Sequence, residues 1–415
     1  MAQSEKLHDA DREARRILSL QTNENTPSAR RLDTALTALF AAAIALIAVL
    51  FWALPDRTLS ETENRALAPF PEISGQTLAD GSFTADIAEY MADQFPGRDA
   101  FIMIRAAAET ALGKGTNNGV FFGRDGYLIA RDDFPNRENI KTNLHAIGAF
   151  SVWCGAREIP VLTAVTGRNA DVLPHMLPTW YGSTYSDRIW TYLEESAGAE
   201  GVALLNLRDP LRERAENGEY VYYRTDHHWT TLGAYYGYCA IMESMGETPY
   251  PLSDFERRTV SLSFTGTSWS TAGAFWMGGD EMEFFRFAGD GDFTTTVVDD
   301  GTSFGGFYDE SYLTKKDKYS AFLSGNHGLV TVQAKDPDDA RQTLLVVKDS
   351  FAHATAPFLA RHYDLVIVDL RYYRQAPAAL VDEYGVDRVL VLYNLDSLST
   401  SATSRMLEAG LDNPG

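Results

Sequence analysis

The feature that most restricts how this chain can fold is an uncharged apolar run near its N-terminus. In Ala35–Leu54 the only polar residue is Thr37. As a helix rising about 1.5 Å per residue, this run matches a bilayer core of about 30 Å. A cleavable signal peptide has a shorter apolar stretch, about 7 to 15 residues, followed by a small-residue cleavage site. We therefore predict an uncleaved transmembrane helix over residues 34–54.

The charges on the two sides of this run predict its orientation. Arg30 and Arg31 come shortly before it, whereas Asp56 and Glu61 follow it. Basic residues beside a span favour the cytoplasmic side of the membrane. The sequence thus predicts a single-pass protein of the cell membrane, with residues 1–33 in the cytoplasm and residues 55–415 outside it.

Composition excludes some classes of function. The formal net charge of −21 repels phosphate backbones, and no basic patch offsets it, so we expect no nucleic-acid partner. Hydrophobic residues form 45% of the 415 residues, enough to build one large core. Cys154 and Cys239 have no partner at metal-ligand spacing, so no zinc site is indicated, and whether they pair stays open.

The pattern beyond the apolar run predicts a linker over residues 55–80 and then an α/β domain over residues 81–415. Three short apolar runs separated by helical patterns are typical of parallel strands covered on both faces: Leu344–Val347, Leu365–Val368 and Val389–Leu392. Residues 255–333 approximately are rich in Gly, Thr, Ser and aromatic residues and lack helical periodicity. We interpret them as a β-rich insertion.

A candidate nucleophile follows the first of these apolar runs. Ser350 comes after a buried strand and before a helical pattern, so it lies outside the carboxyl end of a strand, where α/β sheets bind ligands. Free backbone N–H groups at the start of a helix can also stabilise an oxyanion there. The alternative is that Ser350 or Asp349 only caps the helix.

A serine nucleophile needs a base, and two of the eight histidines lie in the segment Tyr223–Thr231. If this segment is extended, Asp226 and His228 point to one side, while His227 and Trp229 point to the other. Asp226 could then orient the His228 ring and stabilise its charged form. On this interpretation Asp226, His228 and Ser350 are the catalytic residues.

Two other interpretations of this segment stay open. The histidines could be ordinary polar residues before a helix capped by Thr230 or Thr231. Asp226, His227 and His228 could instead be three ligands of a metal in a metal-dependent hydrolase. No fourth ligand is close in the sequence, and adjacent histidines on an extended strand diverge, so we expect no metal and no cofactor.

Several blocks in this order resemble the DHHW family, in which the Thr225–Trp229 string is the defining motif. The other blocks are Ser60–Arg65, Asp93–Arg98, Gly325–His327, Lys348–Phe351, Val368–Tyr373 and Leu392–Asn394. They run from just after the apolar run almost to the C-terminus. The DHHW family is related to the alginate acetylation proteins AlgJ and AlgX. The resemblance implies an SGNH-hydrolase-like fold, a parallel sheet flanked by helices.

The resemblance also implies a chemistry. Asp226 and His228 match the family's Asp-x-His pair, and Ser350 matches its nucleophile. The implied reaction is acetyl transfer to, or acetyl-ester hydrolysis of, cell-envelope carbohydrate or exopolysaccharide, through an acetyl-serine. A membrane-bound O-acyltransferase is the partner implied, because acetyl donors such as acetyl-CoA are cytoplasmic.

The oxyanion of such a reaction needs hydrogen-bond donors beyond the Ser350 amide. The side chains that we nominate for the oxyanion or the substrate follow predicted strands or turns: Asn326, Arg168, Asn169, Asn394 and Arg371. Each of them could instead serve only the structure. The sequence does not separate a transferase from an esterase, and a non-catalytic scaffold that binds glycan with the same fold remains the alternative function.

Overall fold

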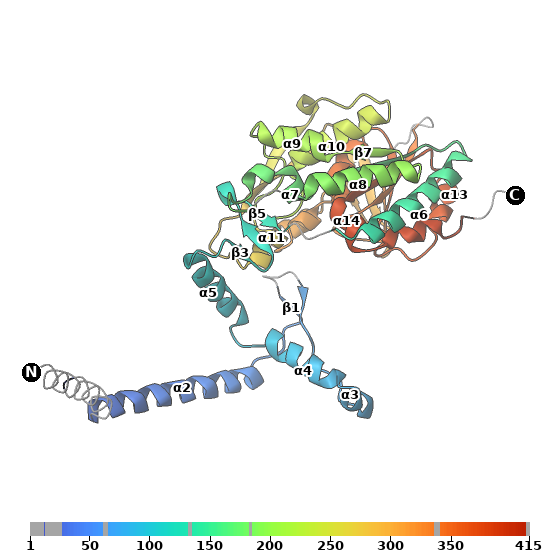
Figure 1. Cartoon of the computed structure of the whole chain (residues 1–415). Coiled ribbons are helices and arrows are strands. Elements are labelled where there is room, and N and C mark those ends of the chain that lie inside the picture. The colour runs from blue at the N-terminus through green and yellow to red at the C-terminus, as the bar shows by residue number, and fades with distance from the viewer. Residues whose placement is uncertain are drawn as a thin grey trace, which may run out of the picture. The chain divides into compact units, whose positions relative to one another are not determined.

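The computed structural model describes residues 12, 27–60, 65–131, 135–181, 185–335 and 341–411 (Figure 1). Contacts divide the chain into two units. The first unit contains the described residues up to 60 together with 65–101, and the second begins at Ile102. The second unit holds the sheet and its flanking helices.

The first unit begins with a long apolar helix, α2 (Pro27–Ala53), which contains most of the predicted span. Its segment Arg30–Ala53 is long and apolar enough to cross a membrane, and none of its most apolar window is buried. After it come β1 (Leu59–Ser60), β2 (Arg65–Ala66), α3 (Gly75–Ala79) and α4 (Ser82–Asp93). Helix α5 (Arg98–Ala111) crosses the boundary between the units.

The described parts of the predicted linker, residues 55–60 and 65–80, are bonded to α4 and to the residue that follows it. The Tyr90 hydroxyl donates to Asp56 Oδ1 at 2.9 Å. The Gln94 side chain accepts from the Arg57 amide at 3.0 Å and donates to the Arg57 carbonyl at 2.9 Å. The Ala68 amide donates to Asp93 Oδ2 at 2.9 Å. These bonds anchor the chain that follows the apolar helix, so it is not a free tether.

The second unit is built on an eight-stranded sheet of order β11-β10-β12-β14-β13-β15-β6-β7. In chain order its strands are β6 (Val161–Thr166), β7 (Leu204–Asn206), β10 (Phe293–Val297), β11 (Thr302–Gly305), β12 (Leu329–Ala334), β13 (Thr343–Lys348), β14 (Asp364–Val368) and β15 (Arg388–Asn394). The five strands from β14 to β7 are parallel to one another. The α/β class is confirmed, and the apolar runs near the C-terminus form β13, β14 and β15.

The complete sheet is mixed, because three antiparallel strands extend the predicted parallel part. Strands β10, β11 and β12 lie antiparallel beside β14. They come from the predicted β-rich insertion, which therefore extends the main sheet. The short connection between β10 and β11 allows only antiparallel pairing, because a parallel crossover needs a dozen or more residues.

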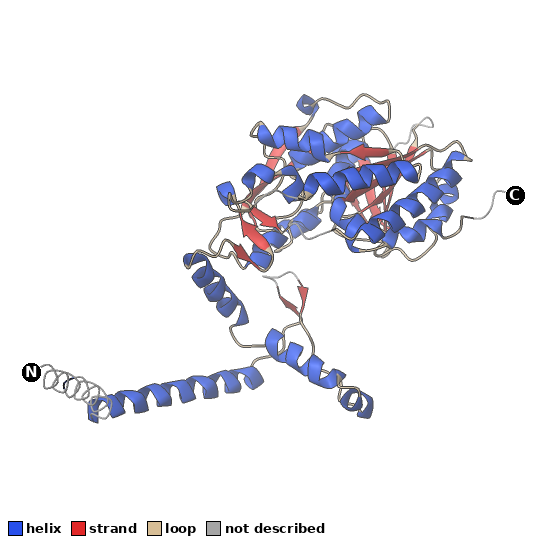
Figure 2. Cartoon of the chain, viewed as in Figure 1, coloured by secondary structure: helices blue, strands red, loops and turns tan. Residues whose placement is uncertain are grey.

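Helices cover both faces of this sheet (Figures 1 and 2). Leu344 and Val346 of β13 pack into one core, and Leu345 and Val347 pack into the other. The first face is covered by α9 (Arg208–Glu216), α10 (Thr231–Ser244) and α12 (Ala352–Leu359); the second is covered by α6 (Arg137–Gly155), α8 (Ser186–Ala199), α13 (Pro377–Glu383) and α14 (Leu395–Thr400). Burial on both faces explains why these strands have continuous apolar sequences.

Smaller elements complete the second unit. They are the sheet of β3 (Thr116–Asn117), β4 (Val120–Phe122) and β5 (Leu128–Ala130), the hairpin of β8 (Glu256–Phe264) and β9 (Asp280–Arg286), and the short helices α7 (Asn169–Val172) and α11 (Thr267–Ala272). Single 3-10 turns are η1 (Arg124–Gly126), η2 (Pro174–Met176), η3 (Leu252–Asp254), η4 (Asp290–Asp292), η5 (Glu310–Thr314), η6 (Tyr319–Ala321) and η7 (Thr403–Glu408). Cys154 and Cys239 are both free thiols.

Candidate active site

The carboxyl ends of the parallel strands meet at one edge of the sheet, and Ser350 lies there in the turn between β13 and α12. Asp349 holds this turn. Its Oδ1 accepts from the backbone N–H of Phe351 at 2.9 Å, and its Oδ2 accepts from the backbone N–H of Asn394 at 2.7 Å. Ser397 Oγ donates to the same Oδ2 at 2.6 Å. Asp349 therefore fixes the backbone of the turn. The Ser350 hydroxyl takes no part in these bonds and has a different partner.

That partner is His228. The distance from His228 Nε2 to Ser350 Oγ is 2.7 Å, and His228 Nδ1 lies 2.5 Å from Asp226 Oδ1. Because an ionised carboxylate only accepts, Nδ1 carries the hydrogen and Nε2 accepts from the serine. We call these three residues the triad. His228 and Asp226 are buried, and Ser350 is half-buried.

The segment that carries Asp226 and His228 is a tight loop, not the extended segment that the alternation of side chains assumed. Tyr222 and Trp229 form an isolated antiparallel bridge, and the Tyr223 amide donates to the His228 carbonyl at 3.2 Å. Within the loop, Asp226 Oδ1 accepts from the His228 amide at 3.0 Å. This local side-chain bond closes a turn, so it brings Asp226 and His228 together.

This loop also corrects the predicted direction of His227. The rings of His227 and His228 lie side by side, with centroids 3.8 Å apart. The expectation that these two rings diverge to opposite sides was therefore wrong, because it assumed strand geometry. Asp226 and His228 are partners as predicted, but a turn joins them instead of the alternation of an extended strand.

A second segment, at the start of α11, holds the other oxygen of Asp226. The Thr267 amide donates to Asp226 Oδ2 at 2.8 Å, and the Thr267 hydroxyl donates to it at 3.1 Å. Burial alone would raise the pKa of Asp226, but the charges of His228 and His227 and these hydrogen bonds hold that pKa far below its ordinary range. Asp226 is therefore ionised and can stabilise an imidazolium.

Aromatic side chains fix the His228 ring in place. Tyr319 stacks on it with centroids 3.9 Å apart and an interplanar angle of 10°. The Tyr319 hydroxyl also donates to the Ser350 carbonyl at 3.2 Å. Phe351 packs against the same ring, with the two ring centroids 5.0 Å apart. Trp229 Nε1 donates to the Phe351 carbonyl at 3.0 Å. Through these contacts, Tyr319 and Trp229 hold the loop that carries His228 against the turn that carries Ser350.

A buried charged network lies directly before the triad serine. Lys348 is fully buried, with its Nζ 2.6 Å from His353 Nε2 and 3.0 Å from Asp369 Oδ2. Burial lowers the pKa of Lys348 and Asp369 opposes this effect, while burial beside Lys348 lowers the pKa of His353 well below its usual value. His353 is therefore the neutral acceptor, and the network joins the ends of β13 and β14 to α12.

Two of the nominated oxyanion or substrate residues extend from this network. Arg371 donates to both Asp369 oxygens, from Nε at 2.9 Å and from Nη2 at 2.6 Å. Its Nη2 also donates to Asn326 Oδ1 at 3.3 Å. The charge of Arg371 contributes to the low pKa of His227, so Arg371 lies within electrostatic range of the triad loop. Asn326 is exposed beside it.

The other three nominated residues hold the loops after β6 and β15. Arg168 forms a buried pair with Asp171, with Nε 2.8 Å from Oδ2. Asn169 Nδ2 donates to the Leu128 carbonyl at 3.2 Å, and Asn394 Nδ2 donates to the Gly167 carbonyl at 2.9 Å. These bonds serve the structure at the strand ends. Within the described residues, no side-chain bond joins them to Ser350.

The residues that could hold a metal are Asp226, His227 and His228, which place one ligand atom each within 4.8 Å of one another. In the triad, however, both His228 nitrogens already have partners, Asp226 and Ser350. A metal bound by all three residues would have to replace the contact with Asp226 or the contact with Ser350. The observed geometry therefore suits proton transfer better than metal binding.

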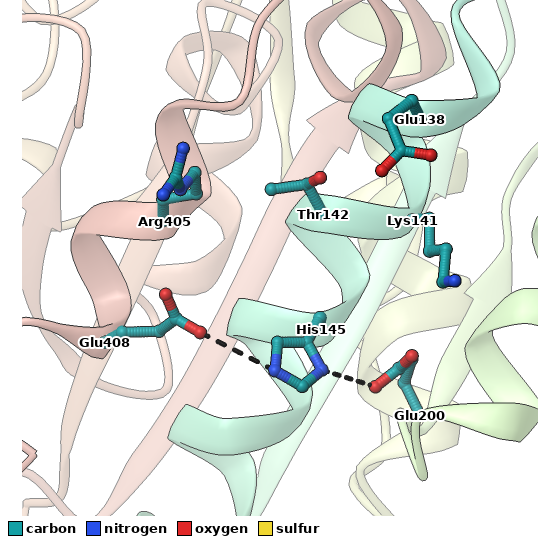
Figure 3. A pocket seen from close by; sticks show the side chains of 7 residues that line it. All are labelled: Glu138, Lys141, Thr142, His145, Glu200, Arg405 and Glu408. Carbon is teal, nitrogen blue, oxygen red and sulfur yellow. Dashed lines mark hydrogen bonds and ion pairs between the residues drawn. The ribbon is translucent and has the colours of Figure 1, made fainter.

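A pocket of about 440 Å³ lies between α6 and η7, away from the triad (Figure 3). Its His145 Nδ1 is 2.8 Å from Glu200 Oε2, and its Nε2 is 3.8 Å from Glu408 Oε1. The hydrogen bond to Glu200 raises the pKa of His145. Because the two carboxylates contact opposite sides of the ring, these groups do not converge on one ion. None of the triad residues lines this pocket.

Sequence reasoning missed several residues around the triad. Thr267 and Tyr319 lie about 40 and 90 positions after the histidine loop, as their numbers show, and no local pattern connects them to it. Phe351 directly follows Ser350, and Lys348 lies two positions before it. A lysine at the end of an apolar run was a visible signal. A lysine in such a run needs a buried partner, and this lysine has two.

The family model described as DHHW protein matches residues 209–369, a segment that contains the whole triad. The resemblance to the DHHW family is confirmed. A second family model, described as SGNH hydrolase-like domain, acetyltransferase AlgX, matches residues 120–274, which include Asp226 and His228.

Solved structures support the fold. A DHHW family protein from Eubacterium siraeum has a TM-score of 0.57 at 22% identity, over 71% of this chain and 96% of that one. PatB1 from Bacillus cereus has a TM-score of 0.57 at 19% identity, over 67% of this chain and 97% of that one. At these identities the likeness establishes an SGNH-like fold, not an activity.

Among curated proteins, the Pseudomonas aeruginosa protein named "Probable alginate O-acetylase AlgJ" is 23% identical over 173 residues. The match covers 41% of this chain and 44% of that protein. The Pseudomonas fluorescens protein of the same name is 24% identical over 176 residues. The chain thus spans less than half the length of the curated relatives that it matches.

Proposed function

We propose that this protein transfers acetyl groups to, or removes them from, cell-envelope carbohydrate or exopolysaccharide outside the cytoplasm. The observation that carries the proposal is the position of His228, which lies 2.7 Å from Ser350 Oγ and 2.5 Å from Asp226 Oδ1. The acetylase names of the curated relatives support the same class of reaction.

In the first half of the proposed reaction, Ser350 is acetylated. Its Oγ attacks the acetyl carbonyl of the donor while His228 Nε2 takes the hydroxyl proton, and Asp226 stabilises the resulting imidazolium. The tetrahedral intermediate collapses when the bond to the leaving alcohol breaks and His228 returns the proton to that alcohol. An acetyl ester on Ser350 remains.

In the second half, an acceptor hydroxyl attacks the acetyl-serine and gives its proton to His228. Ser350 then leaves and recovers that proton. A carbohydrate acceptor makes the protein a transferase, and water makes it an esterase. The Ser350 amide is our first oxyanion donor, because it lies in the turn that leads into α12 and has no acceptor among the described residues. Arg371, with Asn326 beside it, is the second.

The proposed location follows from α2. We propose that this helix anchors the protein as a single span, with residues 1–33 in the cytoplasm and the triad outside. Its length and apolar surface support an anchor. An external transferase needs an activated acetyl group from the cytoplasm, so a membrane-bound O-acyltransferase is the partner that we propose.

The test is covalent labelling of the full-length protein in detergent. We expect a sulfonyl fluoride to modify Ser350, identified by peptide mass spectrometry, and p-nitrophenyl acetate turnover to fall about 1,000-fold or more in Ser350→Ala and in His228→Ala. Ser303→Ala, on the exposed strand β11, is the matched control and should keep full turnover. Equal turnover in the Ser350→Ala protein would exclude the proposed nucleophile and favour a glycan-binding scaffold.

A further inference from the structure

The residue beside the triad histidine has no role in the reaction proposed above. His227 lies next to His228, and its side chain is 42% exposed, whereas that of His228 is 7% exposed. Its ring also approaches Phe351, the neighbour of Ser350, at 6.0 Å. The His227 imidazole is thus partly exposed to solvent beside the triad.

The hydrogen bonds of Thr267 determine which His227 nitrogen carries the hydrogen. The distance from His227 Nδ1 to Thr267 Oγ1 is 2.6 Å. The Thr267 hydroxyl has one hydrogen, and its bond to the ionised Asp226 carboxylate is the stronger use of it. Oγ1 must then accept from His227, so His227 Nδ1 carries the hydrogen. The lone pair of His227 is therefore on Nε2.

The direction of that lone pair follows from the two neighbouring rings. Both Nδ1 atoms approach the same oxygen, Asp226 Oδ1, at 2.5 Å for His228 and 3.8 Å for His227. The Nε2 atoms lie on the far side of each ring from Nδ1, and the rings are 3.8 Å apart. His227 Nε2 therefore points away from Asp226, as His228 Nε2 does, and His228 Nε2 lies 2.7 Å from Ser350 Oγ.

The charge around His227 keeps this nitrogen an acceptor. Burial and the charges of His228 and Arg371 lower the pKa of His227, against the opposing effect of Asp226. The ring is therefore neutral at neutral pH, and its Nε2 can accept a hydrogen bond from a ligand.

We propose that His227 Nε2 binds a hydroxyl of the carbohydrate acceptor, adjacent to the hydroxyl that attacks. The attacking hydroxyl has a single hydrogen, which it must give to His228, so His227 holds a neighbouring one. This inference rests on the proposed function and deepens it: the preferred acceptor is a vicinal diol of a sugar, and water or a simple alcohol lacks the second contact.

No additional covalent step is required. His227 gains and loses no proton, and it only positions the acceptor for attack on the acetyl-serine. A site that pairs with a substrate hydroxyl discriminates against analogues that lack it, because the site's polar group is then left without a partner. His227 is thereby a specificity-determining residue that favours transfer over hydrolysis.

The experiment compares His227→Asn with His227→Gln in the full-length protein. An Asn side chain can keep the contact near Nδ1 with Thr267 but offers nothing at the Nε2 position, whereas a Gln side chain can place its amide oxygen near that position. The donor is p-nitrophenyl acetate. The acceptors are methyl β-glucopyranoside and its 2-, 3- and 4-deoxy analogues, with acetyl-sugar and acetate measured separately.

We expect the ratio of transfer to hydrolysis to fall about 10-fold in His227→Asn, the size of one lost hydrogen bond, and to recover in part in His227→Gln. With the original chain, the ratio of transfer to hydrolysis should fall by a similar factor when one deoxy analogue replaces methyl β-glucopyranoside. With His227→Asn, the same replacement should cause no further fall in this ratio. An unchanged ratio and unchanged deoxy sensitivity in His227→Asn would overturn the inference.

Acetylation of Ser350, followed as the initial burst of p-nitrophenol, separates this inference from the proposed function. If the original chain shows no serine-dependent burst, the proposed function itself is wrong. If the burst occurs but no sugar is acetylated, the acceptor inference is wrong. A burst rate that falls in His227→Asn by the same factor as transfer would also overturn it, because that result indicates damage to the triad.

Discussion

At the scale of single residues, the triad depends on a glycine that never touches the serine. Gly266 lies directly against Asp226, and a Cβ atom added there would overlap Asp226 Oδ2, Cγ and Cβ. The backbone of Gly266 is in an ordinary conformation, so space is the only reason for glycine at this position. The carboxylate reaches its place because residue 266 has no side chain.

We therefore predict that Gly266→Ala displaces Asp226 and lowers p-nitrophenyl acetate turnover by about 100-fold, with the fold retained. The loss should appear in kcat, since the orientation and charge of the His228 imidazolium are affected. Gly278→Ala is the matched control, because an added Cβ there meets no atom within 4 Å. Full activity in Gly266→Ala would mean that Asp226 is not needed in its observed position.

These residues also mark the limit of sequence prediction at the site. The motifs around His228 and Ser350 were enough to nominate the triad, because each motif is a short continuous string. Gly266 and Thr267 act on Asp226 from a segment 40 residues away, and their effect depends on a contact that no local pattern encodes. The tight loop was missed because period-2 alternation cannot distinguish an extended segment from a turn closed by an aspartate.

At the scale of elements, the strands with continuous apolar sequences were predictable and the antiparallel ones were not. Strands β13, β14 and β15 are buried on both faces, so their sequences identify them. Strand β10 has the mixed sequence Phe293–Val297, and its outer neighbour β11 is mostly exposed. Such sequences indicate strands without indicating which sheet they join.

The turn that begins β10 contains a buried acid with an unusual environment. Asp290 Oδ1 accepts from the Phe287 amide at 3.3 Å, and its Oδ2 is 3.9 Å from Arg286 Nη1. Burial raises the pKa of Asp290 to about 6, and the Phe287 amide and Arg286 oppose this only in part. The folded protein thus binds a proton at Asp290 more tightly than the unfolded chain does.

This shift predicts a pH-dependent stability. An acid with a raised pKa in the folded state contributes most at low pH, below about 4, and that contribution is lost as the pH rises through about 6. Asp290→Asn removes the dependence. Its free energy of unfolding, relative to the original chain, should increase by about 2 kcal/mol between these pH values and then stay constant.

Urea unfolding followed by tryptophan fluorescence at a series of pH values measures this difference. Asp292→Asn is the matched control, because Asp292 is exposed in the same turn. The control should show no such pH-dependent gain. A difference for Asp290→Asn that stays constant across the series would show that Asp290 has an ordinary pKa.

At the scale of the whole molecule, the fate of helix α2 determines whether the folded domain stays at the membrane or is released from it. If α2 is retained, the second unit stays tethered to the membrane, where the proposed O-acyltransferase partner would supply activated acetyl groups. If α2 were removed as a signal sequence, the domain would diffuse freely and need a soluble donor. Helix α2 favours retention, because it continues unbroken from Pro27 to Ala53 and the chain after it is bonded to α4.

We predict that the full-length protein keeps residues 1–54 in the mature chain and resists extraction from membranes by alkaline carbonate. Replacing Ala43 and Leu46 together by arginine should release it, because each arginine at the centre of a span costs about 2.5 to 3.5 kcal/mol on insertion. The matched control replaces the same residues by leucine and isoleucine, which keep the helix apolar. Intact mass spectrometry checks the chain length. A C-terminal epitope should be cleaved by protease added outside intact spheroplasts. A shortened chain in the mass spectrum would identify a signal sequence. An epitope protected from the protease would reverse the proposed orientation.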